Sequence, residues 1–267
     1  MVKTTAKTGS DGGRPKPDLL ETFVISVDPP DGPRRKSAQA QLDGIGWRFR
    51  FVDGFASGSR EAMALYSARL NRRRSKRPLT GGEIAAYASH RLAMRMFLDS
   101  GARFGLILED DFGLIAPDSF SRGIEAILKT PIAWDFIKLF DYQPGPISQR
   151  RAAGDLDIVS YAEPGAGMVA YLVTRAGAQK FLSRDLIFRQ IDEDTKFYWE
   201  LGIRVLSASP NPVTEISDRM GGSLIETERL RLRTARTLRR SLKGLRIVID
   251  RQLRHLWHRR RYGIEDS

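Results

Sequence analysis

Residues 104–112 read FGLILEDDF and join an apolar run directly to three consecutive acids. The apolar run is too short for a buried helix and predicts a core strand. Such a strand delivers Glu109, Asp110 and Asp111 to its C-terminal end, which is where open α/β sheets bind ligands. Adjacent carboxylates repel one another and lose their water reluctantly, so we expect a cation to lie against them.

The acidic residues by themselves leave two interpretations open. Strand alternation sends Glu109 and Asp111 to one side and Asp110 to the other, so the outer pair predicts one divalent cation. Hard oxygen ligands in such small number suit Mn²⁺ or Mg²⁺, with substrate phosphate and water completing the coordination. The alternative is a solvated acidic turn that follows a core strand and binds nothing.

The residues before this strand predict one βαβ unit. Residues 21–28 and 47–52 have strand patterns, and residues 34–42 between them predict a short helix. The unit argues for an α/β fold, a mixed and mostly parallel sheet flanked by helices, with a nucleotide-sized crevice at its C-terminal edge. No G-x-G-x-x-G or Walker A motif occurs, so a dinucleotide site or a P-loop is not supported. The candidates to line the crevice are Asp28, Arg34, Arg35 and Asp53.

A helix is predicted for residues 80–99. Thr80 and Glu83 have the spacing of a capping box, so Glu83 has a sufficient structural role at the start of this helix. His90 lies on a second face of the helix, as either a satisfied core histidine or a site residue. The basic run before the helix, residues 72–77, is interpreted as a solvated loop.

The rest of the body alternates helix and strand patterns. Residues 141–154 contain Pro144, Gly145 and Pro146 and predict a long loop, of the kind that forms lids and substrate walls. Helices are predicted at residues 117–129 and 175–184, and strands at residues 134–139, 168–174 and 203–206.

A second acid cluster consists of Asp192, Glu193 and Asp194, at the start of a predicted helix that reaches residue 201. Asp192 fits the N-cap of this helix, a role that needs no chemistry. The same cluster is also the source of candidates for a catalytic base, Asp192 first and Asp194 second.

Composition limits the kinds of site that this chain can build. The 267 residues include no cysteine, which excludes disulfides and cysteine-ligated metals, and only three histidines. Carboxylates are therefore the plausible metal ligands. No run of eighteen apolar residues and no apolar segment near the start of the chain occur, so we expect a cytoplasmic protein.

The basic character of the chain is concentrated in its C-terminal tail. Residues 226–262 contain thirteen Lys or Arg against three acids, which accounts for ten of the twelve net positive charges. We therefore predict a disordered segment at residues 1–20, a catalytic domain at residues 21–225 and a basic tail at residues 226–267.

The tail predicts a basic amphipathic helix, because leucines recur at spacings of three and four with arginines between them. Such a helix suits an anionic membrane surface, with Trp257 at the level of the headgroups. It can equally pack on the main domain or on a copy of itself. A rival function is a non-catalytic protein that binds RNA or DNA through this tail, but the tail lacks regularly interleaved aromatic residues and the body is nearly neutral.

Several segments, taken in order and spacing, resemble glycosyltransferase family 25, which includes lipooligosaccharide galactosyltransferases of Gram-negative bacteria. The likeness spans about residues 21–215, and the chain departs from it at Ser26, where the family commonly has Asn. The segments that carry the resemblance are residues 79–84, Ser89 with His90, residues 108–111, residues 134–137 and residues 170–178.

The resemblance implies a GT-A-like fold and transfer of a hexose, galactose from UDP-galactose, to a lipooligosaccharide or related saccharide. It implies Mn²⁺ or Mg²⁺ on Glu109 and Asp111, and His90 beside the donor. Glu83 and Asp110 join the four crevice residues as candidates for donor binding. With the tail on the inner leaflet of the inner membrane, the acceptor would be lipid-linked. The alternatives within the same fold are another donor sugar, such as glucose, or a capsular or protein-linked acceptor.

Overall fold

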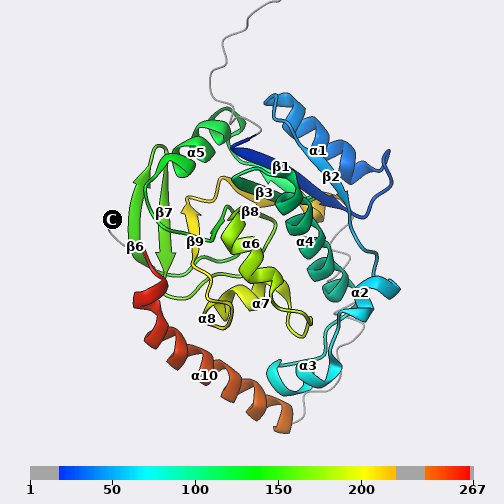
Figure 1. Cartoon of the computed structure of the whole chain (residues 1–267), viewed down its shortest axis with the longest axis vertical. Coiled ribbons are helices and arrows are strands. Elements are labelled where there is room, and N and C mark those ends of the chain that lie inside the picture. The colour runs from blue at the N-terminus through cyan, green and yellow to red at the C-terminus, as the bar shows by residue number, and fades with distance from the viewer. Residues whose placement is uncertain (1–17, 221–237, 265–267) are drawn as a thin grey trace, which may run out of the picture.

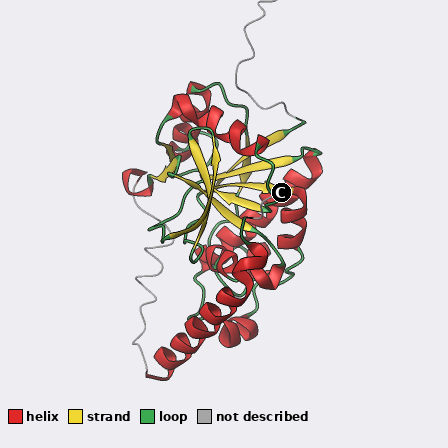
Figure 2. Cartoon of the chain, turned by 90° about the vertical axis from the view of Figure 1, so that its left-hand side faces the viewer, coloured by secondary structure: helices red, strands yellow, loops and turns green. Residues whose placement is uncertain are grey.

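A computed structural model of the chain describes residues 18–220 and 238–264. Its centre is an eight-stranded twisted sheet with the order β2-β1-β3-β8-β5-β9-β7-β6, and helices lie against the sheet (Figures 1 and 2). The strands of this sheet are β1 (Leu20–Ser26), β2 (Arg50–Asp53), β3 (Phe104–Glu109), β5 (Phe136–Lys138), β6 (Ile147–Ala153), β7 (Leu156–Tyr161), β8 (Ala170–Thr174) and β9 (Val205–Ser209). A second, two-stranded sheet pairs β4 (Phe112–Leu114) with β10 (Val213–Glu215).

The sheet is mixed. Strand β1 is parallel to both β2 and β3, and β5 is parallel to β9. Strand β8 lies between β3 and β5 and is antiparallel to both, and the β7–β6 hairpin adds to the far side of β9. The predicted α/β class, with a mixed sheet flanked by helices, is confirmed.

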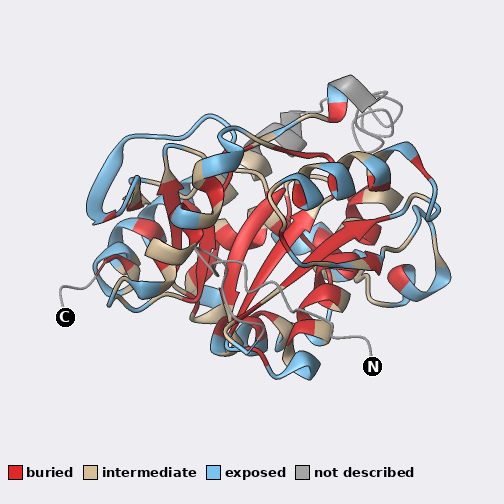
Figure 3. Ribbon diagram, turned by 90° about the horizontal axis from the view of Figure 1, so that it is seen from above, coloured by how far each residue is buried: buried red, intermediate tan, exposed pale blue. Residues whose placement is uncertain are grey.

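The helices form two layers with separate cores. Helices α1 (Pro33–Gly44) and α5 (Pro117–Lys129) contribute to one core, and α4 (Gly81–Ser100) and α6 (Arg175–Leu182) contribute to the other. Strand β3 supplies Leu106 and Leu108 to the first core and Ile107 to the second, which explains its unbroken apolar run. In Figure 3 the central strands of the sheet are buried, whereas the outer helix surfaces are exposed.

Helix α4 begins as predicted. The Thr80 side chain accepts a hydrogen bond from the Glu83 backbone and the Glu83 carboxylate accepts one from the Thr80 backbone, so the capping box is complete. The helix ends at Gly101, whose φ of 78° suits the left-handed conformation of a C-cap.

Two segments that were predicted to be loops contain regular structure. Strand β6 lies within the predicted loop at residues 141–154; it is an edge strand, mostly exposed, so its polar sequence ISQRRAA carries no apolar alternation. The basic run at residues 72–77 begins inside α3 (Ala68–Arg74), which follows the short helix α2 (Arg60–Ala64).

The second acid cluster lies on a broken helix. Helix α7 (Ile191–Lys196) is followed by the single turn α8 (Tyr198–Leu201). The residue at the N-cap is Gln190, so the prediction that Asp192 caps this helix is wrong. Asp192 is the second residue of the helix, after Ile191, whose side chain is buried in the core.

The C-terminal helix α10 (Leu238–Tyr262) packs on the body, after the short 3₁₀ helix η1 (Ser217–Met220) (Figure 1). The first part of the predicted tail and most of the predicted disordered segment lie outside the described residues. Among the residues that are described, no helix is long and apolar enough to span a bilayer.

A candidate active site at the C-terminal edge of the sheet

The ends of four strands bring the polar candidates together. Strands β1, β2, β3 and β5 point the same way, so the residues that follow each of them lie along one edge of the sheet. Asp28 follows β1, Asp53 ends β2, and Glu109, Asp110 and Asp111 end or follow β3.

Arg34 lies between two of the three consecutive acids. Its Nη1 is 3.2 Å from Asp110 Oδ1 and 3.3 Å from Asp111 Oδ2. Its backbone N–H donates to Asp28 Oδ2 at 3.0 Å, which fixes the start of α1 over the end of β1. Burial opposes the positive charge of Arg34, but the two carboxylates outweigh it and raise its pKa. The predicted grouping of Asp28, Arg34, Asp110 and Asp111 is therefore present.

The prediction that Asp110 turns away from Asp111 is wrong. Strand β3 ends at Glu109, and Asp110 and Asp111 form a turn, so the two-residue alternation of a strand stops before them. Both carboxylates consequently contact the same guanidinium group.

The Glu109 side chain turns toward α4, whereas Asp110 and Asp111 contact Arg34 of α1. Glu109 is nevertheless close enough to Asp111 for its charge to raise the pKa of Asp111. Glu109 Oε1 lies 2.9 Å from His90 Nε2, and His90 Nδ1 lies 3.0 Å from the Tyr171 hydroxyl. The Glu109 carboxylate can only accept, so His90 Nε2 carries a proton and donates to it. In the tautomer with that single ring proton, Nδ1 accepts from the Tyr171 hydroxyl, whose pKa is raised by burial. His90 and Tyr171 are buried, whereas the Glu109 side chain is 32% exposed, so a buried chain of hydrogen bonds orients a carboxylate that solvent can reach.

Asp111 is the most perturbed acid of the cluster. Burial and the neighbouring carboxylates of Glu109, Asp110 and Glu215 raise its pKa to about 7, against the opposing effect of Arg34. Its Oδ1 is buried and has no hydrogen-bond partner in the part of the chain that is described. Burial likewise raises the pKa of Asp110. Negative charge in this cluster therefore exceeds the positive charge that Arg34 supplies.

This excess of negative charge suits a hard divalent cation. The donor atoms are carboxylate oxygens, which Mg²⁺ and Mn²⁺ prefer. No group of three or more His, Asp or Glu side chains arranged to hold a metal occurs among the residues that the structure describes. The acidic cluster by itself therefore does not form a complete metal site.

Asp53 ends β2, and Arg35 follows Arg34 in the first turn of α1. The side chains of Asp53 and Arg35 form an ion pair, and the Arg35 guanidinium lies 4.8 Å from the centre of the Phe51 ring. Arg35 is buried, whereas the Asp53 side chain is 91% exposed and open to a ligand.

Two predicted site residues lie in the core. Glu83 is 3% exposed and, besides its role in the capping box, pairs with Arg77 and Gln190. Asp194 is fully buried, 2.6 Å from the Tyr87 hydroxyl and paired with Arg184 at 3.0 Å and Arg189 at 3.3 Å. These contacts give each carboxylate a structural role, at the start of α4 for Glu83 and between α4 and α7 for Asp194.

Asp192 differs from Asp194 in its surroundings. It is half-buried near the start of α7, and its carboxylate is close enough to Arg77 and Lys138 to interact electrostatically with both. Burial nevertheless lowers the pKa of Lys138. Lys138 ends β5 at the same sheet edge as Glu109.

Lys138 and Asp141 form a buried ion pair near this sheet edge that was not predicted from the sequence. Lys138 is 1% exposed, and its Nζ donates to Asp141 and to the backbone carbonyls of Gly165, at 2.9 Å, and Ala166, at 3.1 Å. A side chain at Gly165 would overlap the Asp141 carboxylate, which is why glycine is needed there. The signal in the sequence was a lysine within the otherwise apolar strand FIKLF.

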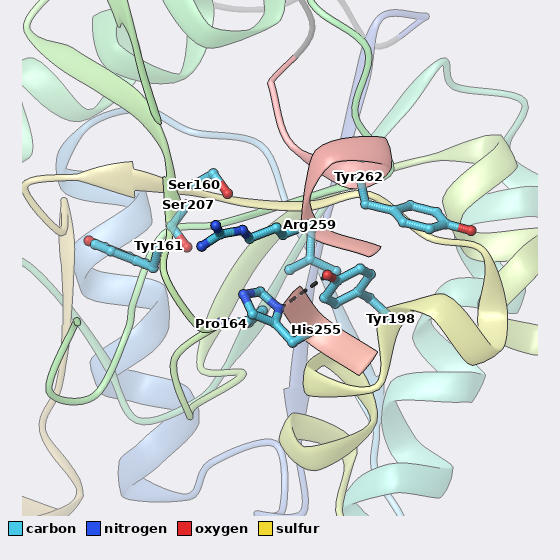
Figure 4. Close-up of a pocket in the computed structure, with 9 residues that line it drawn as sticks. Ser160, Tyr161, Pro164, Tyr198, Ser207, His255, Arg259 and Tyr262 are labelled. Carbon is cyan, nitrogen blue, oxygen red and sulfur yellow. Dashed lines mark hydrogen bonds between the residues drawn. The ribbon is translucent and has the colours of Figure 1, made fainter. Parts of the chain in front are cut away.

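A separate pocket lies between α10 and the strands β7 and β9 (Figure 4). Its lining includes Tyr161, Tyr198, His255 and Arg259, and it shares no residue with the acidic cluster. His255 Nδ1 is 3.1 Å from the Tyr198 hydroxyl, and burial lowers the pKa of His255.

Similarity to solved structures is distant. A protein from STIV has a TM-score of 0.37 at 14% identity, with 71% of this chain and 81% of that chain covered. A glycosyltransferase involved in the glycosylation of the major capsid of PBCV-1 has a TM-score of 0.38 at 11% identity, with the same coverage of 71% and 81%. The 4-diphosphocytidyl-2C-methyl-D-erythritol synthase of Anaerococcus prevotii DSM 20548 has a TM-score of 0.35 at 11% identity, with 82% and 97% covered.

The match to a protein family is the more informative comparison. No curated protein matches the chain in sequence. The family described as "Glycosyltransferase family 25 (LPS biosynthesis protein)" matches residues 19–192, which is more than half of the chain and includes the whole acidic cluster from Glu109 to Asp111. This chain therefore belongs to glycosyltransferase family 25 and is a nucleotide-sugar-dependent glycosyltransferase.

Proposed function

We propose that the enzyme moves a hexose, galactose from UDP-galactose, to a hydroxyl of a lipooligosaccharide, lipopolysaccharide or related acceptor in a metal-dependent reaction. The observation that carries this proposal is the uncompensated negative charge at the sheet edge. Asp111 has a pKa near 7 and a buried, unpartnered oxygen within the described part of the chain, although Arg34 is already beside it. A nucleotide sugar with a divalent cation brings the positive charge and the oxygen ligands that this cluster lacks.

Glu109 and Asp111 are the proposed metal ligands. Mn²⁺ or Mg²⁺, when bound, supplies positive charge that stabilises the departing UDP. Glu109 is oriented for this role by His90, which in turn is held by Tyr171. His90 is thus a positioning residue beside the donor.

The nucleotide crevice is proposed to lie along the ends of β1 and β2. Arg34 and the first turn of α1 face the acidic turn, where a pyrophosphate needs hydrogen-bond donors. Asp28 and Asp110 keep Arg34 in place, and the exposed Asp53 carboxylate, held by Arg35, is available to the ribose or the base.

The proposed base is Asp192. If the reaction inverts the anomeric centre, a carboxylate must accept the proton of the attacking hydroxyl while the oxygen bonds to the sugar and the bond to UDP breaks. Asp192 is partly accessible, whereas Asp194 is enclosed by Tyr87 and two arginines. We therefore assign Asp194, the second candidate, to the support of α7.

The acceptor is proposed to be a lipid-linked saccharide at the cytoplasmic face of the inner membrane, with α10 holding the enzyme at that surface. Confinement to the surface that presents the acceptor raises its effective concentration without any new contact at the active site.

The test is metal-dependent turnover of a panel of UDP-sugars, measured as UDP release with Mn²⁺, with Mg²⁺ and with a chelator. We expect UDP-galactose to be consumed only with metal. The variant Asp111→Asn should lose turnover, whereas the control Asp118→Asn, an exposed acid of α5, should keep it. Turnover that survives both the chelator and Asp111→Asn would contradict the proposed metal site.

The position of the bound metal provides a second test of the proposed ligands. In crystals soaked with UDP and Mn²⁺, the anomalous signal of manganese should lie against Glu109 or Asp111. A manganese ion bound elsewhere would overturn the site assignment even if the enzyme is active.

A further inference from the structure

Helix α10 contacts the body through a polar and aromatic face. His255 bonds to Tyr198, the His258 ring stacks on Trp199 with centroids 5.7 Å apart, and Arg251 pairs with Glu163. Arg251 and His255 are 7% and 8% exposed. In a globular protein, the face of a surface helix that packs on the body is normally apolar.

The opposite face of α10 is apolar and exposed. Its four aliphatic residues follow the helical repeat, at spacings of four, four and three, and Trp257 comes next to the last of them, so the five form one stripe. The exposed fractions are 57% for Leu245, 47% for Ile249, 63% for Leu253, 55% for Leu256 and 84% for Trp257. At these positions the usual distribution of a surface helix is therefore reversed, with Arg251 and His255 buried and the leucines exposed.

Arginines flank this apolar stripe. Asp250 is the single acid between residues 238 and 262, and it is paired with Arg254 at 3.0 Å. Exposed basic residues on the described helix are Arg246, Arg254, Arg259, Arg260 and Arg261.

Helix α3 extends the basic surface. Lys243 Nζ of α10 is 2.5 Å from the Arg72 carbonyl oxygen of α3, and Figure 1 shows α3 beside the N-terminal end of α10. Arg72, Arg73 and Arg74 are exposed in the last turn of α3. The basic run at residues 72–77, interpreted from sequence as a solvated loop, thus adjoins the apolar stripe in space.

We propose that the apolar stripe of α10 and the arginines of α10 and α3 form one docking surface for an anionic lipid bilayer. Leucines and Trp257 enter the boundary between headgroups and acyl chains while arginines on both sides contact lipid phosphates. The stripe from Leu245 to Trp257 covers about 18 Å of helix, which suits a helix lying in the plane of the surface. A second copy of the chain fits less well, because it would place two arginine-rich helices against each other. Docking on this surface would place the enzyme beside the lipid-linked acceptor proposed above, and its biological use rests on that proposed function.

The experiment is flotation of the full chain with vesicles. We expect binding to phosphatidylcholine vesicles that contain about one third phosphatidylglycerol, little binding to pure phosphatidylcholine, and partial loss in high salt. UDP release from UDP-galactose in the absence of vesicles is measured in parallel, so that failure of docking is distinguished from failure of the proposed transfer.

Variants separate the two parts of the surface. The double variant Leu253→Ser/Trp257→Ser should lower the partition coefficient about ten-fold or more. The double variant Arg72→Glu/Arg73→Glu should lower it about twenty-five-fold or more, because each basic residue near an anionic surface contributes about five-fold and the introduced glutamates are repelled. Matched controls are Ile115→Ser, 58% exposed at the end of β4, and Arg48→Glu, exposed before β2; both should bind as the wild type does.

Trp257 provides a direct probe. Anionic vesicles should shift tryptophan emission to shorter wavelength in the wild type, and the shift should disappear in Trp257→Phe while flotation persists. If a double variant unfolds, as judged by thermal melting, Leu245→Ser/Ile249→Ser replaces it. Equal binding to neutral vesicles, unchanged binding by the stripe variants, or a dimer in solution that Leu253→Ser dissociates would each overturn the proposal.

Discussion

The pKa of Asp111 links the stability of the protein to pH. The unfolded chain releases this proton near pH 4, whereas the folded protein retains it until about pH 7 because the carboxyl is buried among other carboxylates. Between these two values the folded state binds more protons, so the free energy of unfolding falls as pH rises, and the loss is complete above pH 7.

The first prediction concerns a variant that lacks the Asp111 carboxylate. Asp111→Asn should be more stable than the wild type at pH 8, by on the order of 1–3 kcal/mol, and the difference should shrink toward pH 5. Urea unfolding of both proteins across this range in metal-free buffer measures it. Asp118→Asn, at an exposed position, should show no such pH-dependent difference. A variant that is less stable than the wild type at pH 8 would contradict the assigned charge excess.

The second prediction concerns the Tyr171 hydroxyl. Tyr171→Phe leaves His90 Nδ1 buried without its 3.0 Å partner, which should lower the free energy of unfolding by about 1–3 kcal/mol. Metal-dependent UDP release should also fall, and the KM for Mn²⁺ should rise, because His90 no longer holds Glu109 in one orientation.

Tyr87→Phe is the matched control for that change. It removes another fully buried hydroxyl, the one that donates to Asp194, so it should lower stability while leaving the KM for Mn²⁺ unchanged. Equal effects of the two variants on KM would mean that Tyr171 has only a structural role.

Asp192 and Asp194 of helix α7 differ in their surroundings. The third prediction is that their substitution affects activity and stability differently. Asp192→Asn should abolish transfer with little effect on the melting temperature, because its carboxylate is partly exposed. Asp194→Asn should lower stability by about 3–5 kcal/mol, because it leaves Arg184 and Arg189 with a weakened partner in the core. Activity per folded molecule and thermal melting together distinguish the two; transfer retained by Asp192→Asn would remove it as the base.

The edge hairpin shows why one element was missed. Strand β6 lies at the edge of the sheet next to β7 and is exposed along most of its length, so its sequence does not need a buried apolar face. Helix α4 is the opposite case, since its Thr80 and Glu83 cap is a local interaction within four residues and is readable without the fold.

For the whole molecule, the fourth prediction is that α10 is an integral part of the folded body. Deletion of residues 238–267 removes the partners of Tyr198, Trp199 and Glu163. The melting temperature should fall by several degrees, at about 2–4 °C per kcal/mol for a protein of this size. Leu253→Ser on the outer face should leave it unchanged. Calorimetry measures both, and an unaltered melting temperature after deletion would show that the packing of α10 contributes nothing.

The sequence by itself determined the parts of this protein that depend on neighbouring residues. These are the buried strand at residues 104–109, the capped helix α4, the acid run that follows β3, and the motifs by which family 25 is identified. Each is encoded within a short window, because strand burial, capping and charge repulsion act over a few residues.

Tertiary structure decided which charges meet. Arg34 lies 76 residues from Asp110 in sequence yet contacts it, and Lys138 reaches 27 residues along the chain to Gly165. The burial of Asp194 and the outward face of α10 likewise follow from packing between distant elements. A short window cannot predict such contacts, because the free energy of a charge depends on whatever the fold brings beside it.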